Sequence, residues 1–216
     1  MKRTISKVAV LGSGIMGSRI ACHFANIGVE VLLLDMAPKE SSDEQSTGGT
    51  VALASKAVRN QIVNAALETA VKSNPSPLFS KKALSKITTG NFEDNMPDIA
   101  SCDWVIEVVV ERLDIKKVIY DQVEKFRKPG TLVTSNTSGI PIHLMAEARS
   151  EDFKAHFCGS HFFNPPRYLR LLEIIPTPQT KPEVVDFLMH YGDKFLGKTT
   201  VLCKDTAAFI ANRVGV

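Results

Sequence analysis

The sequence has few cysteines, no long apolar run and no large excess of either charge. Its 216 residues include four widely separated cysteines, Cys22, Cys102, Cys158 and Cys203. Without a paired motif they indicate reduced thiols and argue against a disulfide framework or a zinc site. No apolar run approaches the ~20 residues of a membrane-spanning helix. We therefore expect a soluble, cytoplasmic protein that does not bind membranes.

The net charge of +3 comes from interspersed signs, so no basic stripe indicates a nucleic-acid partner. Met1-Lys2-Arg3 is followed by a short apolar run, Val8–Leu11, that stops at Gly12. That run is too short for the apolar region of a signal peptide and is typical of a first strand. With 44% apolar and 23% charged residues, the chain has the composition of an ordinary globular protein.

Short runs typical of strands alternate with longer helical patterns, which predicts an α/β fold with a Rossmann-like, doubly wound, mostly parallel sheet. Gly28 follows the first helix as a C-terminal cap. The pattern predicts strands over residues 8–11, 29–35, 87–89, 104–110, 132–135, 159–163, 172–175 and 201–203. It predicts helices over residues 15–27, 113–126, 182–196 and 206–216.

Residues 38–86 are longer than an ordinary crossover connection, so we expect a helical insertion after the second strand. A polar loop is expected over 38–49 and a long helix over 51–71. The last predicted helix reaches residue 216 without a cap. We therefore expect one nucleotide-binding domain over residues 1–204, and the start of a truncated helical domain over 205–216.

Glycines between the first strand and the first helix predict a dinucleotide site. Gly12 permits a tight turn, Gly14 lets a pyrophosphate approach the backbone, and Gly17 lets the helix pack against the strand. Asp35 ends the second strand, where a carboxylate bonds the ribose 2′-hydroxyl. The following Met36-Ala37-Pro38 contains no arginine for a 2′-phosphate, which favours NAD over NADP. The expected cofactor contacts in this loop are Gly12, Gly14, Ile15, Met16 and Gly17.

A second group of polar residues follows two later strands. His161 precedes Glu173 by twelve residues, and apolar residues flank both. This spacing suggests a buried acid/base pair, although core packing is the alternative for a single histidine. Ser135-Asn136-Thr137-Ser138 ends one strand and Asn164 follows the next, at the sheet edge where ligands bind. A simple polar turn is the alternative for Ser135–Ser138, and Asn212 could approach from the last helix.

Together these motifs resemble the L-3-hydroxyacyl-CoA dehydrogenases of fatty-acid β-oxidation, over essentially the whole chain. Val108-Val109-Val110-Glu111 and Lys204-Asp205-Thr206 belong to the same pattern, as does Phe209-Ile210-Ala211-Asn212-Arg213. Asn164-Pro165-Pro166-Arg167-Tyr168 is similar to larger bacterial proteins that join this dehydrogenase to an enoyl-CoA hydratase.

The resemblance implies a role for each matching residue. His161 would take the proton of the substrate 3-hydroxyl, and Glu173 would orient His161. Ser138 and Asn212 would hydrogen-bond the substrate oxygen. The residues expected to line NAD are Glu111, Lys116 and Asn164, although the family usually has asparagine where this chain has Arg112. The insertion would help to hold CoA, with candidate cations Lys56, Arg59, Lys72, Lys81 and Lys82.

The resemblance implies no metal, an acyl-CoA substrate, and a homodimer formed through the missing helical domain. We expect the 216-residue chain to bind NAD(H) but to be poorly active alone. Two alternatives stay open. One is a dehydrogenase of a free 3-hydroxy or sugar acid, and the other is an NAD-binding module without turnover.

Overall fold

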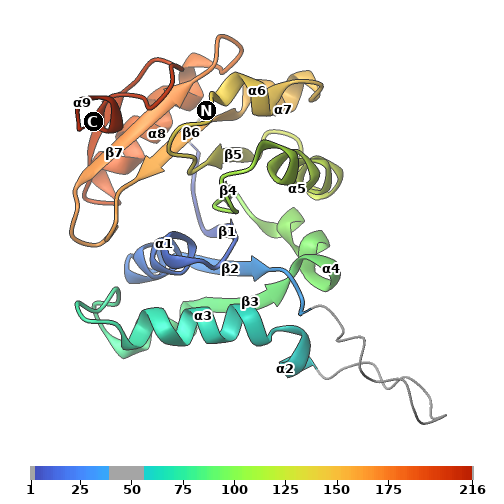
Figure 1. Ribbon diagram of the computed structural model, residues 1–216, viewed down its shortest axis with the longest axis vertical. Helices are drawn as coiled ribbons and strands as arrows, with labels where there is room; N and C mark the ends of the chain where they lie inside the picture. The colour runs from blue at the N-terminus through green and yellow to red at the C-terminus, as the bar shows by residue number, and fades with distance from the viewer. Residues whose placement is uncertain (1–2, 39–55, 216) are drawn as a thin grey trace, which may run out of the picture.

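The computed structural model describes residues 3–38 and 56–215, in which eight strands form one sheet (Figure 1). Its strand order is β3-β2-β1-β4-β5-β6-β7-β8, and every neighbouring pair is parallel except β6 with β7. The strands are β1 (Lys7–Leu11), β2 (Glu30–Asp35), β3 (Ile87–Asn91), β4 (Trp104–Glu107), β5 (Leu132–Ser135), β6 (Phe157–Phe162), β7 (Leu171–Pro176) and β8 (Thr199–Leu202). The predicted mostly parallel α/β fold is confirmed.

Helices cover both faces of the sheet, so the strands are apolar on both sides. Val8 and Val10 pack with α1 (Ile15–Asn26), α3 (Gln61–Lys72) and α8 (Pro182–Lys194). Ala9 and Leu11 point the other way, toward α5 (Leu113–Phe126), α6 (Ile142–Ala146) and α7 (Glu151–Ala155). The two helical layers stand on opposite sides of the strands in Figure 1. This double coverage explains why polar and apolar residues do not alternate along the central strands.

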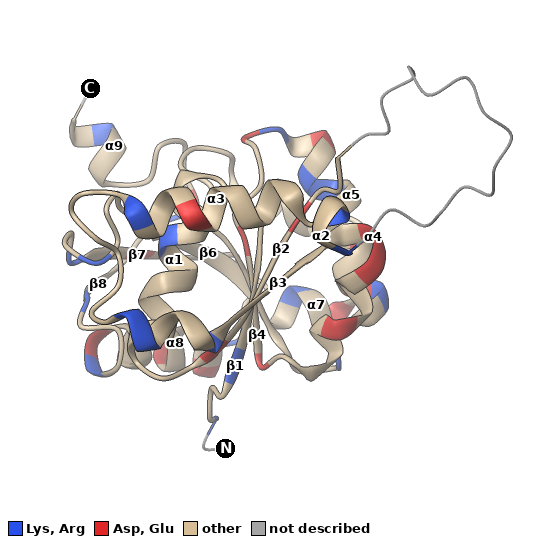
Figure 2. Ribbon diagram, turned by 90° about the horizontal axis from the view of Figure 1, so that it is seen from below, with Lys and Arg blue, Asp and Glu red and all other residues tan. Residues whose placement is uncertain are grey.

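The remaining helical segments are short. They are α2 (Lys56–Arg59), α4 (Phe92–Asn95), α9 (Ala211–Val214) and two 3₁₀ segments, η1 (Lys81–Lys86) and η2 (Met96–Ser101). Within the described ranges, every helix is too short or too polar to cross a lipid bilayer. Acidic and basic residues are interspersed along the helices in Figure 2, as the sequence pattern indicates.

The helical insertion after the second strand is present, but its helix is interrupted. The expected loop over 38–49 lies almost entirely outside the described residues, as do positions 51–55 of the expected helix. In the described part, Asn60 separates α2 from α3. Its buried side-chain oxygen accepts a hydrogen bond from Nδ2 of Asn91, which ties the insertion to the end of β3.

The prediction of a helix over 206–216 is wrong for its first half. Helix α9 contains only Ala211–Val214, because Ala208 and Phe209 have left-handed φ angles of 62° and 48°. This bend buries the Phe209 side chain in the core on the α5 side of the sheet. Smaller errors affect strand ends: the expected strand over 104–110 ends at Glu107, and that over 201–203 is shifted to Thr199–Leu202.

Candidate active site

The glycine loop runs from the end of β1 to the start of α1 and leaves open space there. Gly12 has a φ of +105°, and a Cβ on it would lie 2.6 Å from the Val108 carbonyl oxygen. A Cβ on Gly17 would lie 1.8 Å from the Gly12 oxygen. Nothing lies within 4 Å of a Cβ built on Gly14, the residue before the first turn of α1. The loop therefore leaves room for an anionic group at a helix N-terminus.

Asp35 lies beside this loop at the end of β2. Its Oδ2 accepts hydrogen bonds from the backbone N–H of Ser13, at 2.6 Å, and from the Ser13 hydroxyl. Its Oδ1 accepts one from the N–H of Met36. Asp35 thus fixes the glycine loop, and its side chain stays half-exposed where a ribose would lie. The ribose contact itself stays a prediction.

His161 and Glu173 are direct partners across the antiparallel pair β6–β7. Nδ1 of His161 lies 2.8 Å from Oε2 of Glu173, and the residues are 6% and 1% exposed. The other carboxylate oxygen, Oε1, accepts hydrogen bonds from the backbone N–H groups of Ile210 and Ala211, at 3.2 and 2.8 Å. Both oxygens of Glu173 are therefore engaged, and Nε2 of His161 is the ring nitrogen left for a ligand.

A cavity of about 300 Å³ opens beside this pair. It brings together five residues singled out from the sequence: Met16, Glu111, Ser138, His161 and Asn164. The sequence interpretation gave Asn136 and Phe163 no role of their own, although both line this cavity. The oxygen of Asn136 accepts a hydrogen bond from the Phe162 N–H, which joins the end of β5 to β6.

Ser138 is held from two sides. Oε1 of Glu111 accepts hydrogen bonds from the N–H groups of Ser138 and Gly139, at 3.0 and 3.2 Å, and from the Thr137 hydroxyl. Burial raises the pKa of Glu111, but the hydrogen bond from Thr137 and the charge of Lys116 outweigh it and keep that pKa below its usual value. Nδ2 of Asn212 donates to the Ser138 carbonyl at 3.1 Å, so Asn212 does reach the site.

Lys116 lies behind the cavity wall and not on its surface. It is 1% exposed, and its Nζ lies 2.7 Å from Oε1 of Glu107 and 3.4 Å from Oε2 of Glu111. Glu107 is 0% exposed and also accepts hydrogen bonds from Tyr120 and Ser135. Sequence reasoning missed Glu107, although a lone carboxylate in an apolar strand is a signal, because a buried charge needs a partner. The expected contact of Lys116 with a cofactor stays a prediction.

The other histidines have structural surroundings. Nε2 of His23 bonds the Leu196 carbonyl oxygen. Nδ1 of His143 lies 2.6 Å from Oδ2 of Asp205, and Nδ1 of His156 lies 3.4 Å from Oδ1 of Asp152. In residues 3–38 and 56–215 no group of three or more histidine, cysteine or acidic side chains could hold a metal ion.

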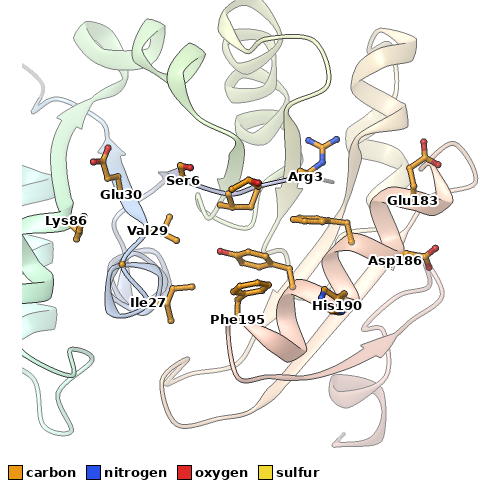
Figure 3. A pocket seen from close by; sticks show the side chains of 15 residues that line it. Arg3, Ser6, Ile27, Val29, Glu30, Lys86, Glu183, Asp186, His190 and Phe195 are labelled. Atoms are coloured by element: carbon orange, nitrogen blue, oxygen red, sulfur yellow. The ribbon is translucent and has the colours of Figure 1, made fainter. Parts of the chain in front are cut away.

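A larger cavity, of about 950 Å³, lies at the opposite, amino end of the parallel strands. Its walls include Ile27, Glu30 and Phe195, which are labelled in Figure 3, and Tyr191. The Tyr191 and Phe195 rings stack with their centroids 4.9 Å apart. Ligands of open α/β sheets bind at the carboxyl ends of the strands. The smaller cavity beside His161 is therefore the candidate active site.

Of the candidate cations in the insertion, two are already paired. Arg59 bonds Glu93 and Asp94, and Lys72 pairs with Glu68. Lys56, Lys81 and Lys82 are exposed, and their contact with CoA stays a prediction.

Residues 7–206 match the family model described as the 3-hydroxyacyl-CoA dehydrogenase NAD-binding domain. The chain belongs to this family. It is 51% identical over 215 residues to a Bacillus subtilis protein named "Probable 3-hydroxyacyl-CoA dehydrogenase". It is 41% identical over 215 residues to a Rickettsia felis protein named "Putative fatty acid oxidation complex trifunctional enzyme". Both alignments cover 100% of this chain, but only 27% and 28% of those relatives.

The fold of this NAD-binding domain is shared with a solved structure. The crystal structure of FadB2 from M. tuberculosis matches with a TM-score of 0.75 and 29% identity, over 98% of this chain and 68% of that one. The domain spans about a quarter of the length of the two curated relatives.

Proposed function

We propose that the protein containing this domain oxidises an L-3-hydroxyacyl-CoA to the 3-oxoacyl-CoA with NAD⁺ in fatty-acid β-oxidation. The observation that carries this proposal is the buried His161–Glu173 pair beside a cavity at the carboxyl edge of the sheet. The names of the relatives support the acyl-CoA substrate.

The domain's residues fit NAD. The open space at Gly14 lies at the N-terminus of α1, and the half-exposed carboxylate of Asp35 stands beside it. A carboxylate there repels a 2′-phosphate, which favours NAD over NADP. Bound NAD supplies the hydride acceptor, which is chemistry that protein side chains do not provide.

His161 acts as the general base in this proposal. Glu173 accepts a hydrogen bond from the Nδ1–H of His161, which favours the tautomer whose Nε2 is unprotonated and can take the proton of the substrate 3-hydroxyl. The hydroxyl must lose this proton as the hydride leaves C3, and a positioned base contributes roughly 10²–10⁴-fold. Glu173 also stabilises the imidazolium that forms. Ser138 lines the same cavity as His161, and Asn212 bonds the Ser138 carbonyl. In this proposal Ser138 and Asn212 bind the substrate oxygen.

The substrate class is tested by comparing acetoacetyl-CoA with free acetoacetate as oxidants of NADH. We expect NADH oxidation with the thioester and little with the free acid. Activity on the free acid alone would favour the alternative of a 3-hydroxy-acid or sugar-acid dehydrogenase.

A second candidate is an NAD-binding module without turnover, since the chain covers only 27% of its B. subtilis relative. We expect the 216-residue chain to bind NAD(H) and to turn over poorly, and we expect any longer protein that carries this domain to be active, cytoplasmic and homodimeric. If the longer protein binds NADH but does not oxidise it with any acyl-CoA, the module is the better description. A normal kcat from the 216-residue chain would contradict the expectation of poor activity.

A further inference from the structure

Arg19 contacts the candidate active site from helix α1. Its Nη1 donates a hydrogen bond of 2.9 Å to Oδ1 of Asn164, a residue 145 positions away that lines the cavity beside His161. Among the described residues, no carboxylate forms an ion pair with Arg19. The guanidinium therefore has a neutral amide as its hydrogen-bond partner.

The direction of this hydrogen bond determines which side of the Asn164 amide faces the cavity. A guanidinium has only donors, whereas an asparagine amide has an oxygen acceptor at one end and an NH₂ donor at the other. Only the oxygen can bond Arg19, so the NH₂ group must point away from it. Within residues 3–38 and 56–215, no acceptor bonds Nδ2 of Asn164. We propose that Arg19 is a positioning residue that turns the Asn164 amide so that the cavity meets its NH₂ group.

Hydrogen bonds hold the backbone of the loop that carries Asn164. Rotation of the Asn164 side-chain amide is therefore the main degree of freedom left at this residue. Nζ of Lys198 is buried and donates to the carbonyl oxygens of Pro166 and Leu169. Nη1 of Arg167 donates to the carbonyl oxygens of Ser76 and Leu78, at 2.8 and 2.7 Å. These bonds attach residues 166–169 to the residue before β8 and to the loop after α3. They hold the backbone near Asn164 but do not touch its side chain.

The ligand atom next to Asn164 must accordingly be a hydrogen-bond acceptor. This step rests on the proposed function and on the expectation, implied by the family resemblance, that Asn164 lines NAD. The carboxamide oxygen of the nicotinamide is such an acceptor. An inverted amide would present its own oxygen and oppose that contact. Arg19 therefore contributes to NAD(H) binding through Asn164 and not through a contact of its own.

The test measures NADH binding to the 216-residue chain by fluorescence titration, for single and double variants. We expect Arg19→Met and Asn164→Ala each to weaken binding by about 3- to 10-fold, the range of one net hydrogen bond. Combining them should add nothing further, because Arg19 acts through Asn164. Arg19→Lys keeps a donor-only group and should restore most of the affinity. Asn164→Asp keeps the partner of Arg19 but removes the NH₂ donor, and should bind as weakly as Asn164→Ala.

Lys194→Met is the matched control, since it removes an exposed cation from the end of α8, and it should bind NADH as the unchanged chain does. If Arg19→Met weakens binding equally with and without Asn164, Arg19 contacts the ligand directly and the proposal is overturned. Unchanged binding by Arg19→Met also overturns it and leaves the proposed function intact. If the unchanged chain does not bind NADH, the proposed function fails and this inference fails with it.

Discussion

Replacing Glu173 by glutamine changes the charge and the hydrogen bonding of the proposed catalytic pair without changing its shape. Glutamine has one oxygen and one NH₂ group where Glu173 has two oxygens. The oxygen is needed by the N–H groups of Ile210 and Ala211, which donate to Oε1. The NH₂ group then faces Nδ1 of His161 and can only donate to it. His161 must carry its proton on Nε2, the nitrogen that should accept the substrate proton.

We expect Glu173→Gln to lower kcat by the whole contribution of the general base. That contribution is roughly 10²–10⁴-fold in rate, or about 3–5 kcal/mol in the activation free energy. The free energy of unfolding should fall less, by about 1–2 kcal/mol, because the two backbone bonds remain but lose their charged acceptor. NADH binding should be nearly unchanged, since Glu173 lies behind His161 and away from the glycine loop.

The assay is NADH oxidation by acetoacetyl-CoA in the longer protein, with kcat and KM measured separately. Glu93→Gln is the control, because it makes the same chemical change at an exposed site in α4. NADH titration of each variant shows that the domain is folded. A folded Glu173→Gln variant with kcat within twofold of the unchanged enzyme would refute the assignment of His161 as the base.

Three other perturbations test the glycine loop and two groups of buried side chains. Gly14→Ala should leave the melting temperature unchanged but weaken NADH binding more than tenfold, because the added Cβ enters the open space. Gly17→Ala should also destabilise the fold, because the added Cβ meets the Gly12 oxygen. Differential scanning fluorimetry measures the change in stability, and NADH titration measures the change in binding. Burial lowers the pKa of His23 from 6.5 to about 4, so the unfolded chain binds this proton first and stability should fall by up to about 3 kcal/mol as the pH falls from 6.5 to 4. Urea denaturation at several pH values should show a flatter acid limb for His23→Gln, and an equally steep one would contradict this. Burial raises the pKa of the Cys22, Cys158 and Cys203 thiols to about 12. DTNB at pH 8 should therefore label these thiols only after the chain unfolds.

The parts of the site that could be predicted from the sequence are those with local signals. The glycine loop is a contiguous motif between a strand and a helix. His161 and Glu173 are close in the sequence because one hairpin joins their strands. Their pairing needs no knowledge of the rest of the fold beyond the strand pattern.

The parts that could not be predicted depend on contacts between distant segments. The bend at Ala208 and Phe209 places two residues other than glycine at positive φ, which no local propensity favours. It is stabilised by the burial of Phe209 and by the N–H groups that reach Glu173. The hydrogen bond between Arg19 and Asn164 likewise joins segments 145 residues apart.

The antiparallel hairpin of β6 and β7 has a consequence for the order in which the site assembles during folding. His161 and Glu173 are separated by 12 residues, whereas Arg19 and Asn164 are separated by 145. The entropy of closing a flexible loop grows with the logarithm of its length, so the longer closure costs about 2 kcal/mol more. Hairpins form in about 1–10 μs, well before parallel strands find distant partners. His161 and Glu173 can therefore meet early, and the cavity wall contributed by helix α1 is completed only when the whole sheet has formed.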